Sequence, residues 1–515
     1  METVAVIYAV GISDYALYET LGSGTTACAR VISIARALPN VRRGVLITDR
    51  EPELRASLWP EDFGPVVPGT PGSVSDVLET IRRESEGADH LFFIWGDTPL
   101  IDPELADRMF RRHVKYFASY TFADGYPQGV APEILGTGCL GQLSELAGRH
   151  DVEQGRTMLF DVIRKDINAF DLETEVSPRD LRLHRVVLAA DTRRNYLLLG
   201  RVMEKGGVDA ESIVRVVEEH QEVLRTLPAY MQVQITEGCP QSCMYCPYPQ
   251  IAGATKAGKE TGGEDVTQLT GSMELETWKT LLEDAHSYCD DLVVGIGLWG
   301  EPALHDDIAE MVKAALAYPK FRVVIETSGV GWSVEDLRSI SRFDTDRVDW
   351  IVSLDAATPE TYKKIRGPQW DEVWSAIQMM RELYPVSRLH IQAVRMHENE
   401  EELEQFYRYW KNEEVPLIIQ KYDNFCGMLP DKKVTDLSPL TRFACRHLKR
   451  DLAVLMDGSV RMCREDVKGE YPLGNIIEEG METVWERMTP FYLRHIKGDL
   501  PSLCERCDEY YTFNF

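Results

Sequence analysis

Three cysteines in the middle of the chain, Cys239, Cys243 and Cys246, are the residues best suited to do chemistry. Their spacing, C-x3-C-x2-C, offers three thiolates to a metal centre. A four-iron, four-sulfide cluster held by only three thiolates keeps one iron free for a substrate or cofactor. The same spacing also fits one face of an amphipathic helix. Because Gly238 and Pro240 flank the first cysteine, a helix is disfavoured there, and the triad predicts an iron–sulfur site on a loop.

A second group of four cysteines lies near the end of the chain. Four thiolates close a cluster completely, so a cluster there would have no open iron, which favours electron transfer. A structural zinc site is the alternative, since a C-x2-C pair with two distant cysteines also suits tetrahedral zinc. An Asp-Gly pair at 457–458 predicts a hairpin between the first two of these cysteines. The four cysteines are Cys445, Cys463, Cys504 and Cys507.

The elements that must position these groups alternate between strand-like and helix-like segments, which predicts an α/β protein with mainly parallel sheets. Six strand-like segments in the middle of the chain predict a partial (β/α)6 barrel. Active groups gather at the carboxyl ends of the strands in such barrels. The cysteine triad and several polar residues follow the ends of these segments. The six segments are 229–235, 292–297, 322–326, 350–354, 389–394 and 417–420.

The first 205 residues show the same alternation and predict a separate α/β domain. Strands are expected at 4–10, 44–48, 91–95 and 186–190, with helices at 26–38 and 195–204. The expected domain organisation is an N-terminal domain over 1–205, a linker helix over 206–228, a barrel over 229–430 and a small cysteine-rich domain over 431–515.

The cysteine triad, the segment Gly297-Leu-Trp-Gly-Glu-Pro302 and the run that begins at Ser353 together resemble the radical S-adenosylmethionine (SAM) enzymes. The resemblance implies a cluster whose open iron is chelated by the amino and carboxylate groups of SAM. It also implies formation of a 5′-deoxyadenosyl radical that abstracts hydrogen from a substrate. An external electron donor such as a flavodoxin or ferredoxin would reduce the cluster.

The same resemblance assigns further residues to the cofactor. Glu301 or its neighbouring backbone would bind the amino group, and Asp355 would lie near the ribose and carboxylate, unless it caps the following helix. Tyr422 and Asp423, after the sixth strand, are candidates for substrate contact or proton transfer, unless they form an ordinary turn. The remaining cofactor candidates are Gly300, Ser328, Ser353, Gln392 and Met396.

The C-terminal cysteines resemble the SPASM extension of radical enzymes in its short, single-cluster form, often called twitch. This resemblance implies a second four-iron, four-sulfide cluster.

The N-terminal region resembles the nucleotidyltransferases that make sugar nucleotides, with a GT-A or Rossmann-like fold. Gly96-Asp-Thr-Pro and Asp191 carry this likeness, and it implies that Asp97 and Asp191 could hold magnesium. Residues 9–24, which correspond to the phosphate-binding turn of those enzymes, contain no basic residue. Because a triphosphate needs nearby cations, we expect a repurposed binding domain and not an active transferase.

Composition excludes several partners. The net charge of -27 argues against binding to nucleic acid or to anionic lipid. The chain contains no run of 18 apolar residues, so no membrane span is predicted. The start of the chain lacks the features of a signal peptide. Clustered cysteines suit a reducing compartment, so a cytoplasmic protein is expected.

The whole chain resembles the spiro-SPASM proteins, which implies a radical SAM oxidoreductase. Its substrate would be a peptide or protein side chain, by analogy with SPASM relatives. One alternative is oxidation or epimerisation of a sugar or nucleotide held by the N-terminal domain. A non-catalytic binding scaffold with structural metals is the other.

Overall fold

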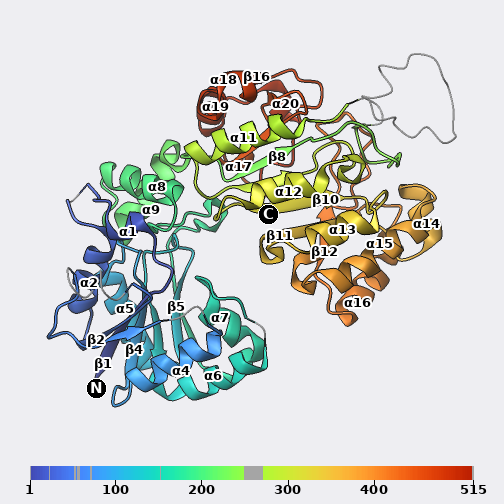
Figure 1. Cartoon of the computed structure of the whole chain (residues 1–515). Helices are drawn as coiled ribbons and strands as arrows, with labels where there is room; N and C mark the ends of the chain where they lie inside the picture. Colours follow the sequence, from blue (N-terminus) through green and yellow to red (C-terminus); the bar gives the residue numbers. More distant parts are fainter. Residues whose placement is uncertain are drawn as a thin grey trace, which may run out of the picture. The chain divides into compact units, whose positions relative to one another are not determined.

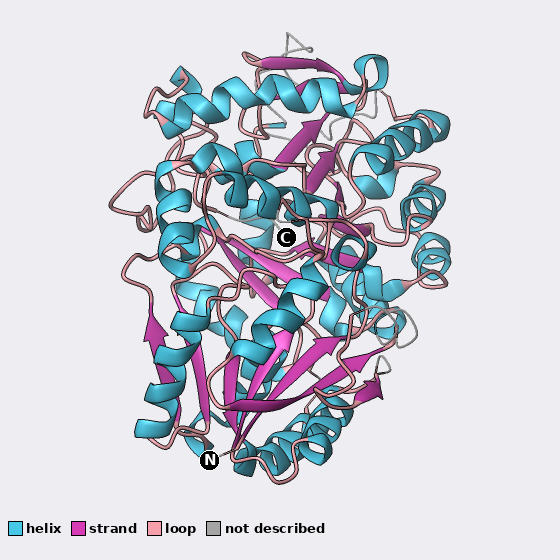
Figure 2. Ribbon diagram, turned by 90° about the vertical axis from the view of Figure 1, so that its left-hand side faces the viewer, coloured by secondary structure: helices cyan, strands magenta, loops and turns pink. Residues whose placement is uncertain are grey.

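The structure is a computed structural model, and it describes residues 2–512 except 23, 51–53, 55–57, 70–71, 151 and 249–270. The chain forms two compact units, Met1–Thr226 and Leu227–Phe515 (Figure 1). Strands and helices are mixed in both units (Figure 2), which confirms the predicted α/β class.

The first unit is built on a seven-stranded sheet of order β3-β2-β1-β4-β6-β5-β7. Strand β1 is completely buried and pairs in parallel with β2 and β4, whereas β6 runs antiparallel to β4 and β5. The predicted strand at 186–190 is wrong, because these residues form only an isolated bridge between Gln128 and Val187. The strands are β1 (Thr3–Ala9), β2 (Val41–Thr48), β3 (Val66–Pro68), β4 (His90–Trp95), β5 (Tyr120–Asp124), β6 (Glu133–Gly136) and β7 (Leu172–Val176).

Helices cover both faces of this sheet. Successive side chains of β1 point to opposite faces of the sheet. Ile7 shares a core cluster with α2, α5, α8 and α9 on one face, and Val6 shares one with α4, α6 and α7 on the other. Helix α9 lies in the segment expected to be a linker, and its Ile213 and Val217 belong to the core of this unit. The helices are α1 (Asp14–Leu17), α2 (Ala27–Ala37), α4 (Val74–Glu84), α5 (Pro103–Lys115), α6 (Leu140–Arg149), α7 (Met158–Ile163), α8 (Arg193–Glu204) and α9 (Ala210–Glu219).

The second unit contains the six predicted parallel strands, β8 to β13, in sequential order within one sheet. This arrangement confirms the partial barrel. Helix α14 is capped by Thr358 and not by Asp355, so the helix-cap alternative for Asp355 is wrong. The strands are β8 (Tyr230–Val233), β9 (Val293–Ile296), β10 (Arg322–Thr327), β11 (Val348–Ser353), β12 (Leu389–Arg395) and β13 (Leu417–Lys421). The intervening helices are α11 (Leu275–Tyr288), α12 (Ile308–Leu316), α13 (Val334–Ile340), α14 (Pro359–Ile365), α15 (Trp370–Leu383) and α16 (Leu403–Asn412).

The C-terminal region continues the barrel sheet. Strand β14 (Asp451–Val454) pairs in parallel with β8, and β15 (Ser459–Arg461) and β16 (Pro472–Asn475) add antiparallel strands. The predicted Asp-Gly hairpin joins β14 to β15, with Gly458 at a φ of 80° that favours glycine. This pairing brings the C-terminal cysteines to the β8 side of the barrel. The helices here are α17 (Arg446–Arg450), α18 (Ile476–Glu479), α19 (Met481–Ile496) and α20 (Ser502–Glu505).

Among the residues that the structure describes, no helix is long and apolar enough to cross a lipid bilayer.

Candidate functional site

The cysteine triad lies on the loop that follows β8, and the segment after β9 packs closely against this loop and hydrogen-bonds to it. Gly300 has a φ of 84°, and a Cβ there would lie 2.2 Å from the Thr236 carbonyl oxygen. The Glu301 amide donates to the Gly238 carbonyl at 2.9 Å, and the Gly238 amide donates to the Tyr248 hydroxyl at 2.7 Å. Only glycine at position 300 allows the two segments to approach this closely.

The three thiols of the triad are close enough to affect one another electrostatically. Burial, together with the neighbouring Cys243, raises the pKa of Cys246 to about 12. Burial first, and then Glu301 and Cys243, raise the pKa of Cys239. Thiolates in such a place need a bound cation, and three thiols on one buried loop are the donor set that an iron–sulfur cluster with one open iron requires. The residues present therefore fit the group.

Asp355 holds the cysteine loop in place through hydrogen bonds. Its carboxylate is fully buried, and Oδ2 accepts from Arg366 Nη1 and from the Tyr245 hydroxyl, both at 2.6 Å. Oδ1 accepts from the Val394 amide at 2.7 Å. Because Tyr245 lies between two cysteines of the triad, this network fixes the course of the loop. The carboxylate oxygens are occupied by the protein itself.

Glu301 and Ser328 lie together, as their places at strand ends predicted. The buried Glu301 carboxylate accepts from the Thr327 hydroxyl at 2.5 Å, from the Ser328 hydroxyl at 2.6 Å and from the Ser328 amide at 2.8 Å. Burial raises the pKa of Glu301. Its side chain thus ties the end of β10 to the loop that follows β9.

The other cofactor candidates lie at the ends of β11 and β12. Ser353 and Gln392 are register partners, and Gln392 Nε2 donates to Gln420 Oε1 at 3.0 Å, which gives a polar row across three neighbouring strands. Met396 is fully buried and packs in one cluster with Tyr245 of the cysteine loop.

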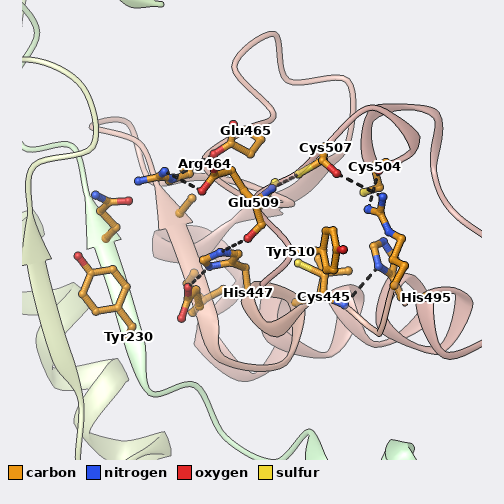
Figure 3. A pocket seen from close by; sticks show the side chains of 17 residues that line it. Tyr230, Cys445, His447, Arg464, Glu465, His495, Cys504, Cys507, Glu509 and Tyr510 are labelled. Atoms are coloured by element: carbon orange, nitrogen blue, oxygen red, sulfur yellow. Dashed lines mark hydrogen bonds and ion pairs between the residues drawn. The ribbon is translucent and has the colours of Figure 1, made fainter. Parts of the chain in front are cut away.

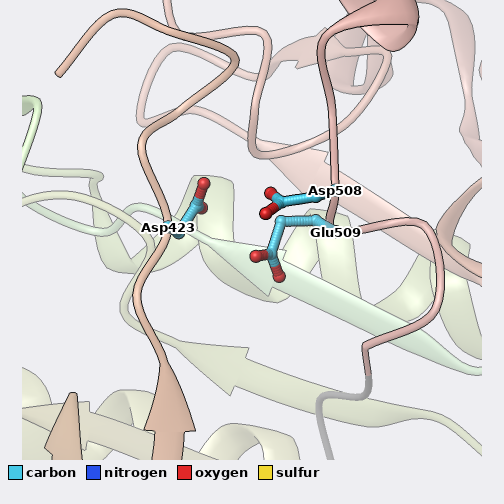
Figure 4. Close-up of side chains that lie close together, drawn as sticks. All are labelled: Asp423, Asp508 and Glu509. Carbon is cyan, nitrogen blue, oxygen red and sulfur yellow. The ribbon is translucent and has the colours of Figure 1, made fainter. Parts of the chain in front are cut away.

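The two catalytic candidates differ in their surroundings. Tyr422 is buried, and its hydroxyl donates to the Pro430 carbonyl at 2.8 Å. Asp423 lies beside Asp508 and Glu509 of the C-terminal segment (Figure 4). Lys421 and Arg464 supply the compensating charges. Lys421 pairs with Asp508 at 3.2 Å and with Glu509, and Arg464 Nη2 lies 3.6 Å from Asp423 Oδ2.

The four C-terminal cysteines line one cavity, which has an empty volume of about 570 Å³ (Figure 3). Arg442 donates to the carbonyl of Cys504 at 2.7 Å and to that of Cys507 at 3.2 Å. The Glu509 amide donates to Cys507 Sγ at 3.3 Å, which is a contact typical of a metal-bound thiolate.

His495 adds a suitable donor to this cavity. Burial lowers the pKa of His495 to about 4, so the ring is neutral. Nδ1 accepts from the Cys445 amide at 3.4 Å, which leaves the proton on Nε2. Within the described part of the chain, the buried Nε2 has no partner. His495 lines the same cavity as the four thiols, and a ring N–H beside them fits an iron–sulfur cluster, whose sulfurs accept such bonds.

Cys426 is a residue that sequence reasoning missed, because it stands apart from both groups of cysteines in the sequence. It lies just after β13 at a φ of 56°, is 3% exposed, and its thiol lies close to that of Cys507. Its neighbours Phe425 and Met428 pack against the same side chains as Cys239. Residues 425–428 therefore lie between the two cysteine sites. The position after the sixth strand was the signal that could have identified it.

Two family models match the second unit. Residues 233–409 match the Radical SAM superfamily, and residues 445–508 match SPASM, an iron-sulfur cluster-binding domain. An uncharacterized protein of Treponema pallidum (strain Nichols) is 34% identical over 376 residues, which cover 70% of this chain and 99% of that protein. The chain belongs to the radical SAM superfamily. As a radical SAM enzyme it uses SAM and iron–sulfur chemistry, and a SPASM domain follows its catalytic barrel.

Other relatives of this radical SAM enzyme are more distant. The spore coat polysaccharide biosynthesis protein SpsF of Bacillus subtilis is 26% identical over 138 residues, covering 26% of this chain and 57% of that protein. The PqqA peptide cyclase of Rhizobium meliloti is 28% identical over 160 residues, covering 31% of this chain and 37% of that protein.

Proposed function

We propose that this radical SAM enzyme is an oxidoreductase that carries two four-iron, four-sulfide clusters. The observation that carries the proposal is the grouping of seven cysteines into a set of three on the loop after β8 and a set of four around one cavity. When bound to the triad, the cluster and SAM would supply the radical chemistry that abstracts hydrogen from the substrate. An external donor such as a flavodoxin or ferredoxin would provide the electron.

The residues of the chain bind and orient the cofactors, and they exclude water from the site. Cys239, Cys243 and Cys246 hold the first cluster, and the Asp355 network keeps their loop in place. The backbone around Gly300, with the Glu301–Ser328 pair behind it, would bind the amino group of SAM. Ser353 and Gln392 would face the ribose, and Met396 the adenine. Among the two catalytic candidates Asp423 is better placed to take a proton, since the Tyr422 hydroxyl is already engaged.

The proposed substrate is a peptide or protein side chain. The likeness to a peptide cyclase supports this class, and the likeness to SpsF supports the alternative, a sugar or nucleotide bound by the first unit. Pooled peptides and nucleotide sugars can be compared for their ability to stimulate SAM cleavage. Stimulation by nucleotide sugars alone would reject the peptide proposal. A scaffold function would require that loss of Cys243 leave the cellular function intact.

Replacement of Cys504 by alanine should separate the two cluster sites. We expect iron to fall from about eight to about four per chain, because only the second cluster loses a ligand. Formation of 5′-deoxyadenosine should persist, whereas turnover of substrate should fall. Iron analysis and product chromatography of anaerobic protein measure both. An unchanged iron content with stoichiometric zinc would show that the C-terminal site holds zinc.

Replacement of Cys426 by alanine should lower the midpoint potential of the second cluster without loss of iron. The thiol lies close to the Cys507 sulfur. A hydrogen bond from it to that sulfur would stabilise the reduced, more negative cluster. A redox titration followed by electron paramagnetic resonance measures the shift. The matched control is Cys139→Ala, a cysteine of the first unit. Equal potentials in the two variants would contradict this role.

A further inference from the structure

Arg156 bridges the two aspartates that the sequence suggested as magnesium ligands. Its Nη1 and Nη2 donate to the two carboxylate oxygens of Asp97 at 3.1 and 2.7 Å. Its Nη2 and Nε also donate to Asp191 Oδ2 at 2.9 and 3.3 Å. The other oxygen of Asp191 accepts from Asn195 at 2.8 Å. One guanidinium therefore engages the facing oxygens of both carboxylates.

The bridge is held in place by its surroundings. The side chains of Arg156 and Asp97 are only 17% and 11% exposed, and the guanidinium lies over the Trp95 ring at 5.4 Å from its centroid. A planar guanidinium that binds a carboxylate through two parallel bonds is a strong, directional partner. Magnesium would need the same oxygens at 2.0–2.1 Å in octahedral geometry. The residues present do not fit that ion.

We propose that Arg156 takes the place of a divalent cation between Asp97 and Asp191, so that the first unit binds its ligand without a metal. The single charge of Arg156 faces two carboxylates, so the site keeps a net negative charge. Together with the absence of basic residues from 9–24, this charge disfavours a nucleoside triphosphate.

The adjoining cavity indicates which chemistry the ligand has instead. It has an empty volume of about 990 Å³, and the aromatic side chains of Trp95, Tyr120, Phe122, Tyr126 and Phe160 line it. Arg156 is the one cation among its described lining residues, and both aspartates engage it. These features suit an uncharged or cationic ligand with an apolar face.

The sign of a stability change tests the bridge. In the full-length, cluster-loaded chain with EDTA, Asp97→Asn should lower the melting temperature of the first unit, because Arg156 loses its better partner. If the site were instead a metal site from which EDTA had removed the ion, its two facing carboxylates would repel each other. Asp97→Asn would then raise the melting temperature. The control Asp180→Asn, at an exposed pair with Arg182, should change nothing. A raised or unchanged melting temperature for Asp97→Asn would overturn the proposal.

Metal and nucleotide binding give a second, independent readout. Titration with Mn²⁺, followed by electron paramagnetic resonance of the free ion, should show equal uptake by the wild-type chain and by Asp97→Asn. Calorimetry with CTP and Mg²⁺ should give no binding heat with either protein. One additional Mn²⁺ in the wild type, or CTP binding that Asp97→Asn abolishes, would overturn the proposal.

Discussion

Replacement of Cys243 by serine should reduce formation of 5′-deoxyadenosine by more than about 100-fold. Loss of a residue that merely supports a metal ligand typically costs 10–100-fold, and loss of a ligand itself should cost more. Cys243 is a free, buried cysteine of the cysteine loop. Iron should also fall from about eight to about four per chain. Anaerobic reconstitution, iron analysis and chromatography of the nucleoside products measure both effects.

The matched control is Cys139→Ser. Cys139 lies in the first unit, where its thiol donates to the Gly136 carbonyl at 3.1 Å, a bond that a serine hydroxyl can replace. This variant should keep the iron content and the activity of the wild type. If Cys243→Ser also kept both, the triad would not be the catalytic cluster site.

Replacement of Asp355 by asparagine should destabilise the second unit by about 3–5 kcal/mol, the usual cost of breaking a buried ion pair. The change preserves shape but leaves Arg366 without its ion-pair partner, at a place where the side chains of Asp355 and Arg366 are 0% and 5% exposed. The Tyr245 hydroxyl loses a charged acceptor as well, so the loop should hold its cluster less firmly. Denaturant unfolding of the metal-free chain measures the stability, and the rate of iron loss to a chelator measures the loop.

An exposed ion pair provides the comparison. Glu404 and Arg408 lie on the surface of α16 with side chains 70% and 73% exposed, and Glu404→Gln should change stability little. A similar small effect of Asp355→Asn on both unfolding and iron release would show that the network does not support the cysteine loop.

The sequence predicted features that depend on local pattern. Six apolar segments with intervening helices identified the barrel strands, and short spacings identified both groups of cysteines. The strand predicted at 186–190 was wrong, because a short apolar segment can be buried without pairing into a sheet. Apolar content reports burial more reliably than strand pairing.

Features that depend on contacts between distant residues escaped prediction. Arg156 contacts Asp97 across 59 positions of sequence, and no motif near either residue indicates that they form a pair. Tyr245 reaches Asp355 across 110 positions, which makes Asp355 a support for the cysteine loop. Cys426 approaches Cys507 only because β13 and the C-terminal segment meet in the fold. Each of these roles follows from the tertiary structure.

Cleavage of SAM by the full-length chain tests the central claim most directly. The chain, reconstituted anaerobically to about eight irons, is incubated with dithionite and SAM. The account predicts 5′-deoxyadenosine and methionine in equal amounts, with formation lost in Cys243→Ser. No 5′-deoxyadenosine from protein that carries both clusters would contradict it.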